Sequence, residues 1–156
     1  MRKQKGFSLI ELLIVVAIIL IIAAIAIPNL LRSRIAANEA SAVGSVRTIN
    51  TAEVTYASTY PNQGFAAALS NLGGTTPCTP STTTGCLIDQ TLASGSKSGY
   101  TFTATATGTA PLTIYGVNAA PITPGTSGQR YFYSDQSGVI RFNLTAAASS
   151  TDSALQ

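Results

Sequence analysis

Residues 6–28 read GFSLIELLIVVAIILIIAAIAIP, an apolar run that contains a single charged residue, Glu11. From Leu12 to Ile27 there are sixteen consecutive residues without a polar side chain. A helix rises about 1.5 Å per residue, so residues 7–27 would span roughly 30 Å, the thickness of a bilayer's hydrocarbon core. The run therefore predicts a membrane-spanning helix. A buried helix of a soluble core would need a larger and less polar protein around it.

Glu11 is a residue that a simple membrane anchor does not need. A charged side chain at the centre of a bilayer costs about 2.5–3.5 kcal/mol, and such residues usually have a partner. Because Glu11 lies only four residues after Phe7, it could stay near the headgroups or take up a proton. A functional role requires a cation at the same depth, and the apolar run itself supplies none.

The net charge of the chain is concentrated before the apolar run. The 156 residues carry nine Lys and Arg and six Asp and Glu, a formal charge of +3. Arg2, Lys3 and Lys5 are three of these cations, which leaves residues 7–156 with six basic and six acidic groups. Basic residues before an apolar run hold that end in the cytoplasm, so we expect one small domain outside it.

The two cysteines fit an exported domain. Cys78 and Cys86 lie in a loop-like stretch rich in Thr, and an even number of cysteines in an exported chain favours a disulfide. Two free thiols are the alternative. A metal site is disfavoured because the chain has no histidine and no second cysteine pair.

The stretch Gly6-Phe7-Ser8-Leu9-Ile10-Glu11, followed by an apolar helix, resembles the N-terminal signature of type IV prepilins and of the related type II secretion pseudopilins. A secretory signal cut after its apolar region is the competing interpretation. The resemblance implies that a membrane peptidase removes residues 1–6 as a leader by cutting after Gly6, and that the new amine of Phe7 is methylated. It also implies the missing cation, because Glu11 would pair with the Phe7 ammonium of a neighbouring subunit during assembly.

Pro28 is a predicted weak point in a long helix. Proline lacks an amide hydrogen and clashes with the preceding turn, so the membrane helix either ends there or continues with a kink. We favour a continuous helix over residues 7–60, with residues 7–28 as its membrane and polymerisation part. In the resembled family the segment after the corresponding proline can lose helical structure in the filament, which implies a hinge at Pro28. Apolar residues continue at helical spacing after Pro28: Ile35, Ala42, Val46, Ile49, Tyr56 and Tyr60.

The rest of the chain predicts a small sheet, and hence an α+β fold of the pilin type. Residues 61–99 are rich in Gly, Pro, Ser and Thr and predict a loop region with one short helix at 65–72. Period-two alternation over residues 100–145 predicts antiparallel strands, and residues 146–156 predict a frayed tail. The face packed on the helix is expected to include Phe102, Ile114, Phe132 and Ile140.

The inventory of reactive side chains favours a structural protein over an enzyme. There is no histidine, the carboxylates Asp89, Asp135 and Asp152 are scattered, and no cofactor or metal is expected. The sequence leaves nucleic-acid binding open, because the domain is neutral but a filament would repeat its few cations.

We therefore expect a subunit of a type IV pilus-like filament for adhesion, motility or uptake. It would be stored in the inner membrane as a single-pass protein with its head outside the cytoplasm. Its expected partners are copies of itself, the prepilin peptidase and N-methyltransferase, the pilus assembly machinery and the lipid bilayer. The alternatives are a periplasmic pseudopilin of type II secretion and a membrane-anchored binding or adhesive module that does not polymerise.

Overall fold

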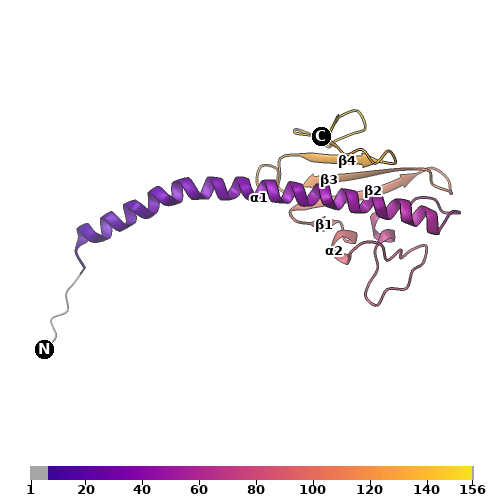
Figure 1. Ribbon diagram of the computed structural model, residues 1–156, viewed down its shortest axis with the longest axis horizontal. Coiled ribbons are helices and arrows are strands. Elements are labelled where there is room, and N and C mark those ends of the chain that lie inside the picture. Colours follow the sequence, from indigo (N-terminus) through magenta and orange to yellow (C-terminus); the bar gives the residue numbers. More distant parts are fainter. Residues whose placement is uncertain (1–6, 156) are drawn as a thin grey trace. The chain divides into compact units, whose positions relative to one another are not determined.

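The computed structural model describes residues 7–155, so the leader expected at residues 1–6 lies outside the described residues. The chain divides into two compact units, Met1–Arg34 and Ile35–Gln156. Helix α1, Leu9–Thr59, is 51 residues long and contributes to both units (Figure 1). Its part in the first unit is apolar, whereas its part in the second unit carries the residues that build a core.

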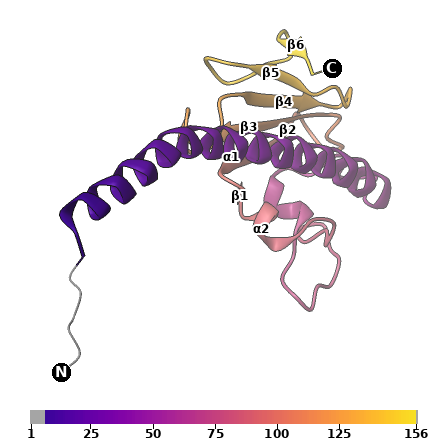
Figure 2. The ribbon, with the colours of Figure 1, turned by 60° about the vertical axis from the view of Figure 1, so that its left-hand side comes forward.

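The second unit contains a six-stranded antiparallel sheet whose strand order follows the chain (Figure 2). The fold is α+β, as the sequence predicts. Its strands are β1 (Ser96–Lys97), β2 (Tyr100–Thr107), β3 (Ile114–Pro121), β4 (Tyr131–Asp135), β5 (Arg141–Asn143) and β6 (Ser153–Ala154). Consecutive strands can pair directly because short connections suffice between antiparallel neighbours.

The core of the second unit lies between α1 and one face of the sheet (Figures 1 and 2). Strand β2 alternates between buried and exposed residues, as expected for a strand with one face on a core. The buried side chains on α1 recur every three or four residues, which keeps them on one face of the helix. They include Ala42, Val46, Ile49 and Tyr56, and the sheet supplies Tyr100, Phe102, Val117 and Phe132.

Three of the four sheet residues predicted to face the helix are buried, and Ile114 is not. Ile114 is 54% exposed, whereas its neighbour Tyr115 is 2% exposed and takes the inward position. Side chains alternate across a strand, so an error of one residue reverses the face. The prediction for Ile114 was wrong because period-two alternation alone does not fix which of the two alternating sets of residues faces the core.

Two short strands form where the sequence predicted a loop and a tail. Strand β1 pairs with β2 through a tight turn in which Ser98 and Gly99 both have positive φ, 51° and 76°, as in a type I′ hairpin. At the other edge β6 pairs with β5, and the Leu155 amide donates to the Ile140 carbonyl at 2.7 Å. The C-terminal segment is therefore pinned to the sheet rather than frayed.

The connection between α1 and β1 contains two helices of one turn each. The 3₁₀ helix η1, Leu69–Leu72, falls within the short helix predicted at 65–72. Helix α2, Gln90–Ala93, begins after Asp89, whose side chain accepts the Leu92 amide at 2.9 Å as an N-cap. Leu69, Leu72 and Leu92 are buried, so this connection extends the core below the sheet edge.

Candidate functional site

The first unit presents an apolar surface with no core of its own. Within the described residues, one helix is long and apolar enough to cross a membrane, with a mean hydropathy of 3.3 over its most apolar window and none of that window buried. The large apolar side chains from Leu9 to Leu31 are exposed in the single chain. A continuous apolar surface of this extent marks a site that contacts lipid or other protein.

Glu11 lies at the start of this surface and caps helix α1. Its Oε2 accepts a hydrogen bond from the Ser8 backbone amide at 2.9 Å. Because α1 begins at Leu9, Ser8 occupies the N-cap position and Glu11 the third helical position, the spacing of a capping box. This local role of Glu11 was not predicted, although the Ser-x-x-Glu pattern of a capping box is a signal for it.

The two residues at the expected cleavage point are only partly described. Gly6 lies outside the described residues, and Phe7 follows it as an 80% exposed side chain. The partner expected for Glu11 belongs to another subunit, so its contact with Phe7 is not tested by one chain. The geometry places Phe7, Ser8 and Glu11 within one turn of the start of the apolar surface.

Pro28 lies inside α1, and the helix continues through it. Without an amide hydrogen, Pro28 cannot donate to the carbonyl of Ala24, so one rung of the helical hydrogen-bond ladder is missing. In the next turn, the Ser33 hydroxyl donates to the Asn29 carbonyl at 3.0 Å, the side-chain back-bond that serine makes within helices. The helix is thus locally weaker here, while the hinge itself stays a prediction.

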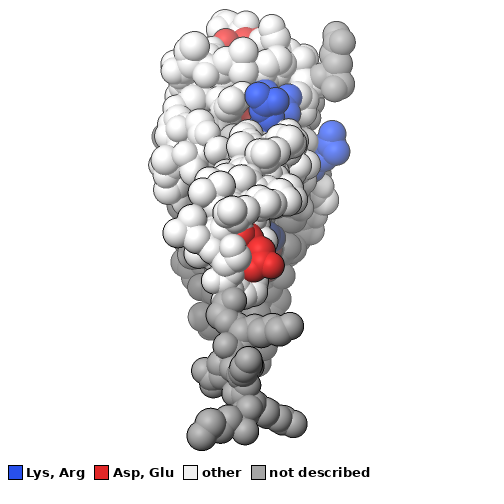
Figure 3. All heavy atoms as spheres, turned by 90° about the vertical axis from the view of Figure 1, so that its left-hand side faces the viewer, with Lys and Arg blue, Asp and Glu red and all other residues white. Residues whose placement is uncertain are grey.

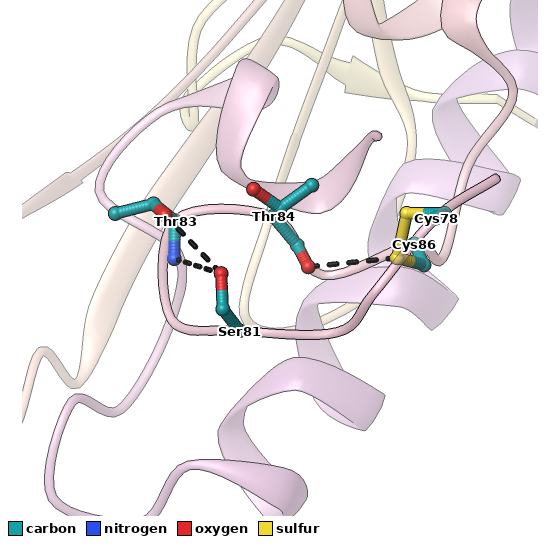
Figure 4. Close-up of a disulfide and its surroundings, with 5 residues drawn as sticks. All are labelled: Cys78, Ser81, Thr83, Thr84 and Cys86. Atoms are coloured by element: carbon teal, nitrogen blue, oxygen red, sulfur yellow. Dashed lines mark hydrogen bonds between the residues drawn. A yellow bond between two sulfur atoms is a disulfide. The ribbon is translucent and has the colours of Figure 1, made fainter. Parts of the chain in front are cut away.

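Cys78 and Cys86 form a disulfide in the connection between η1 and α2 (Figure 4). Their Cα atoms are 6.0 Å apart, within the range of ordinary disulfides. After Cys86, the Leu87 amide donates to the Leu72 carbonyl at 2.7 Å, so this side of the loop is anchored to η1. The disulfide closes a small loop at the surface and encloses no reactive side chain.

Charged side chains on the second unit are few, and four of the nine form ion pairs. On the face shown in Figure 3, charged side chains form separate small groups on a largely uncharged surface. Glu39 pairs with Arg130 at 2.7 Å, and Asp89 pairs with Lys97 at 2.9 Å. Within residues 7–155, no group of three or more His, Cys, Asp or Glu is arranged to hold a metal ion.

The comparisons with known proteins concern the same N-terminal segment. Residues 1–27 match the family model of the prokaryotic N-terminal methylation motif. The type IV wide pilus major component PilA4 of Thermus thermophilus is 67% identical over 39 residues, 25% of this chain and 30% of that protein. The type IV major pilin protein PilA of Myxococcus xanthus is 43% identical over 54 residues, 35% of this chain and 24% of that protein. The N-terminal segment is thus similar to that of type IV pilins.

The pilin similarity covers a minority of each chain. This chain spans less than a third of the length of the two curated pilins. No solved structure matches it. The pilin-type segment thus agrees with the resemblance carried by residues 6–11, while the role of the whole protein is argued below.

Two buried carboxylates on the pilin-type helix were not recognised from the sequence as part of the core. Glu39 and Glu53 lie on the same stripe as Ala42, Val46 and Ile49, and both are buried. The signal was their spacing, because residues 39, 42, 46, 49, 53 and 56 recur every three or four positions. A carboxylate in such a stripe must find a partner inside the protein.

Proposed function

We propose that this chain is the structural subunit of a type IV pilus-like filament, assembled through its apolar N-terminal helix. The observation that carries the proposal is an exposed apolar surface that begins with the methylation motif and contains one carboxylate, Glu11. In the membrane this surface contacts lipid. In a filament it contacts the same surface of other copies. Because lipid and neighbouring helices are both apolar, the surface can be accommodated in either place, so the subunit can be stored in the membrane and also assembled.

Glu11 supplies the register of this assembly in our proposal. Cleavage after Gly6 leaves a free amine on Phe7, which the N-methyltransferase then methylates. The resulting ammonium lies at the membrane depth of a neighbouring subunit's Glu11. Charges about 4 Å apart attract by several kcal/mol at an effective dielectric constant near 20, against the cost of desolvating both groups. Only one axial offset between neighbouring helices brings the two charges together, so other offsets are disfavoured.

The proposal includes processing, location and partners. A prepilin peptidase and N-methyltransferase would act on Gly6 and Phe7, and the assembly machinery would extract the subunit from the inner membrane. The subunit would be single-pass, with the Ile35–Gln156 unit outside the cytoplasm, and its role would be structural rather than enzymatic. Adhesion, motility and uptake are the filament functions proposed for it.

Intact mass of the protein purified from its native host tests the processing step. The expected mass lacks residues 1–6 and contains one added methyl group on Phe7. A chain that starts at Met1, or one cut near Ala26, would contradict the prepilin assignment.

Two variants of Glu11 separate its charge from its capping role. Glu11→Gln keeps an oxygen that can accept the Ser8 amide, whereas Glu11→Val removes both the cap and the charge. We expect both variants to insert in the membrane and both to yield far fewer filaments in electron micrographs of sheared surface material. Normal filament yield from Glu11→Gln would show that the cap alone suffices and that the ion pair is wrong.

The same micrographs distinguish the alternative functions. Long surface fibres composed of this chain support a pilin. Short assemblies confined to the periplasm indicate a type II secretion pseudopilin, and a subunit that never assembles indicates a membrane-anchored binding or adhesive module.

A further inference from the structure

Glu53 is a buried carboxyl group that the proposed function does not use. It lies on the stripe of α1 that faces the core, and the residue is 0% exposed. Its Oε2 accepts a hydrogen bond from the Ala66 amide at 2.8 Å. Its Oε1 is buried and has no hydrogen-bond partner among the described residues. The carboxyl group is thus half satisfied, which is uncommon for a buried polar group.

The groups that face Glu53 provide no opposite charge. Tyr56 on the same helix and Tyr115 on β3 are the titratable groups whose phenols sense its charge. Glu53 takes part in no ion pair within residues 7–155. Burial, opposed in part by the hydrogen bond from Ala66, raises the pKa of Glu53 to about 7. Below that pH, the closed structure therefore favours the neutral carboxylic acid over the carboxylate.

The contact with Ala66 joins α1 to the segment that follows it. We call residues 61–68 the latch segment. It is also held by the Phe65 amide, which donates to the Leu112 carbonyl at 2.9 Å, and by the Leu112 amide, which donates to the Gln63 carbonyl at 2.7 Å. The rings of Phe65 and Tyr115 meet edge to face at 4.6 Å. The segment also meets β2 at one isolated bridge, between Ala68 and Thr105. The ladder between β2 and β3 is made by the two strands alone, so opening of the segment leaves that ladder paired.

We propose that Glu53 and Ala66 form a proton-controlled latch, which holds the latch segment against α1 when the carboxyl group is neutral and releases it when the group ionises. Ionisation in the closed state would leave a negative charge out of water and without a cation. Opening lets water reach the carboxylate and removes this penalty. The latch does not depend on filament formation.

The pH range of the latch follows from proton linkage. The pKa of Glu53 is 4.5 for an ordinary glutamate and about 7 in the closed structure. A carboxyl group with a raised pKa stabilises the closed state fully below the ordinary value, and this stabilisation declines as the pH rises through the raised value. Between pH 6 and pH 8, the equilibrium constant for opening should increase about tenfold.

Amide hydrogen exchange of the full chain in detergent micelles tests the latch. Peptides that cover the latch segment should lose about tenfold in protection from pH 6 to pH 8, after correction for the intrinsic exchange rate. Peptides from β2 and β3 should keep the same corrected protection. Glu53→Gln retains an oxygen for the Ala66 amide but cannot ionise, so its latch segment should be protected equally at both pH values.

Glu39→Gln is the matched control, because it neutralises the other buried carboxylate of the same helix stripe. It should retain the pH-dependent exchange of the latch segment. Equal protection of this segment in the wild-type chain at both pH values would overturn the latch. A change that persists in Glu53→Gln, or one shared equally by β2 and β3, would overturn it as well.

Discussion

Glu39 illustrates how a carboxylate can lie in an apolar helix stripe. Its Oε1 accepts the amides of Gln129 and Arg130 at 2.9 and 3.1 Å, and its Oε2 accepts the Arg130 Nε at 2.7 Å. Burial by itself would raise the pKa of Glu39, but these hydrogen bonds and the Arg130 charge together lower it. Glu53, with one hydrogen bond and no cation, shows the opposite shift. Both residues are buried, Glu53 more deeply than Glu39, and they differ in their partners.

Replacing Glu39 with glutamine should lower the free energy of unfolding by about 2 kcal/mol at pH 7, the range for hydrogen bonds to a charged group. Because the pKa of Glu39 is lowered on folding, its stabilisation is complete above the ordinary value and is lost as the pH falls through the lowered one. The difference between wild type and Glu39→Gln should therefore shrink by pH 3. Urea denaturation at both pH values measures it.

The exposed pair of Lys97 with Asp89 provides the control for Glu39. Both side chains of that pair are substantially exposed, 35% and 49%. Solvent screening limits such pairs to below about 1 kcal/mol. Lys97→Gln removes the ion pair but keeps the Asp89 cap of α2, so it should change stability little. An effect as large as that of Glu39→Gln would contradict the expectation that a buried ion pair stabilises the fold more than an exposed one.

Among the elements, the disulfide loop makes most of its backbone hydrogen bonds to the rest of the second unit through the residues around Cys86. Beyond Cys86, backbone hydrogen bonds join residues 85–88 to residues 71–73. Between the cysteines, the Thr82 carbonyl accepts hydrogen bonds from the Tyr56 hydroxyl and from the Asn71 side-chain amide. The other contacts there are local, such as the Thr83 amide donating to the Ser81 hydroxyl at 3.3 Å (Figure 4). The disulfide therefore restrains a surface loop rather than holding the sheet together.

Replacing both Cys78 and Cys86 with serine should lower the free energy of unfolding by at most about 2.5 kcal/mol, the chain-entropy value for a loop of this length. Limited proteolysis should become faster at residues 74–84, because the disulfide no longer closes that loop. The strands should resist cleavage as before. Reduction of the wild-type chain should reproduce both effects and leave the double variant unchanged. Faster cleavage within β2 or β3 would show that the disulfide supports the sheet.

For the molecule as a whole, the periodicity of apolar residues in the sequence predicts the long helix and the sheet, but it does not predict several of the tertiary contacts. The apolar stripe of α1 was predictable because its spacing of three and four residues repeats over many turns of the helix. Ile114 was misplaced because a strand's register depends on its partners. Strands β1 and β6 were missed because two residues are too few to show a period. A partner in another subunit, as proposed for Glu11, leaves no trace in one chain's contacts.

The burial of charged residues on the core-facing stripe of α1 also could not be predicted from this sequence. A pattern of apolar residues treats Glu39 and Glu53 as exposed, since charged residues are rarely buried. The structure buries both because Gln129, Arg130 and Ala66, remote in sequence, supply donors. The methylation motif lies at the opposite extreme. Its recognition depends on contiguous residues, so it was found without any tertiary information.

Removal of residues 1–34 tests whether the Ile35–Gln156 unit folds without the apolar segment. Every buried apolar residue of the core lies between Ala42 and Ala148, so deletion of the apolar segment removes no core contact. A chain that begins at Ile35 should therefore fold, remain monomeric without detergent, and unfold with a free energy within about 1 kcal/mol of that of the full chain in micelles. Circular dichroism and analytical ultracentrifugation measure these properties.

The matched control keeps the same start but replaces Phe132, a fully buried residue, with alanine, which should cost about 3–5 kcal/mol. An aggregated or unfolded chain from Ile35 would mean that the apolar segment is needed for folding as well as for assembly.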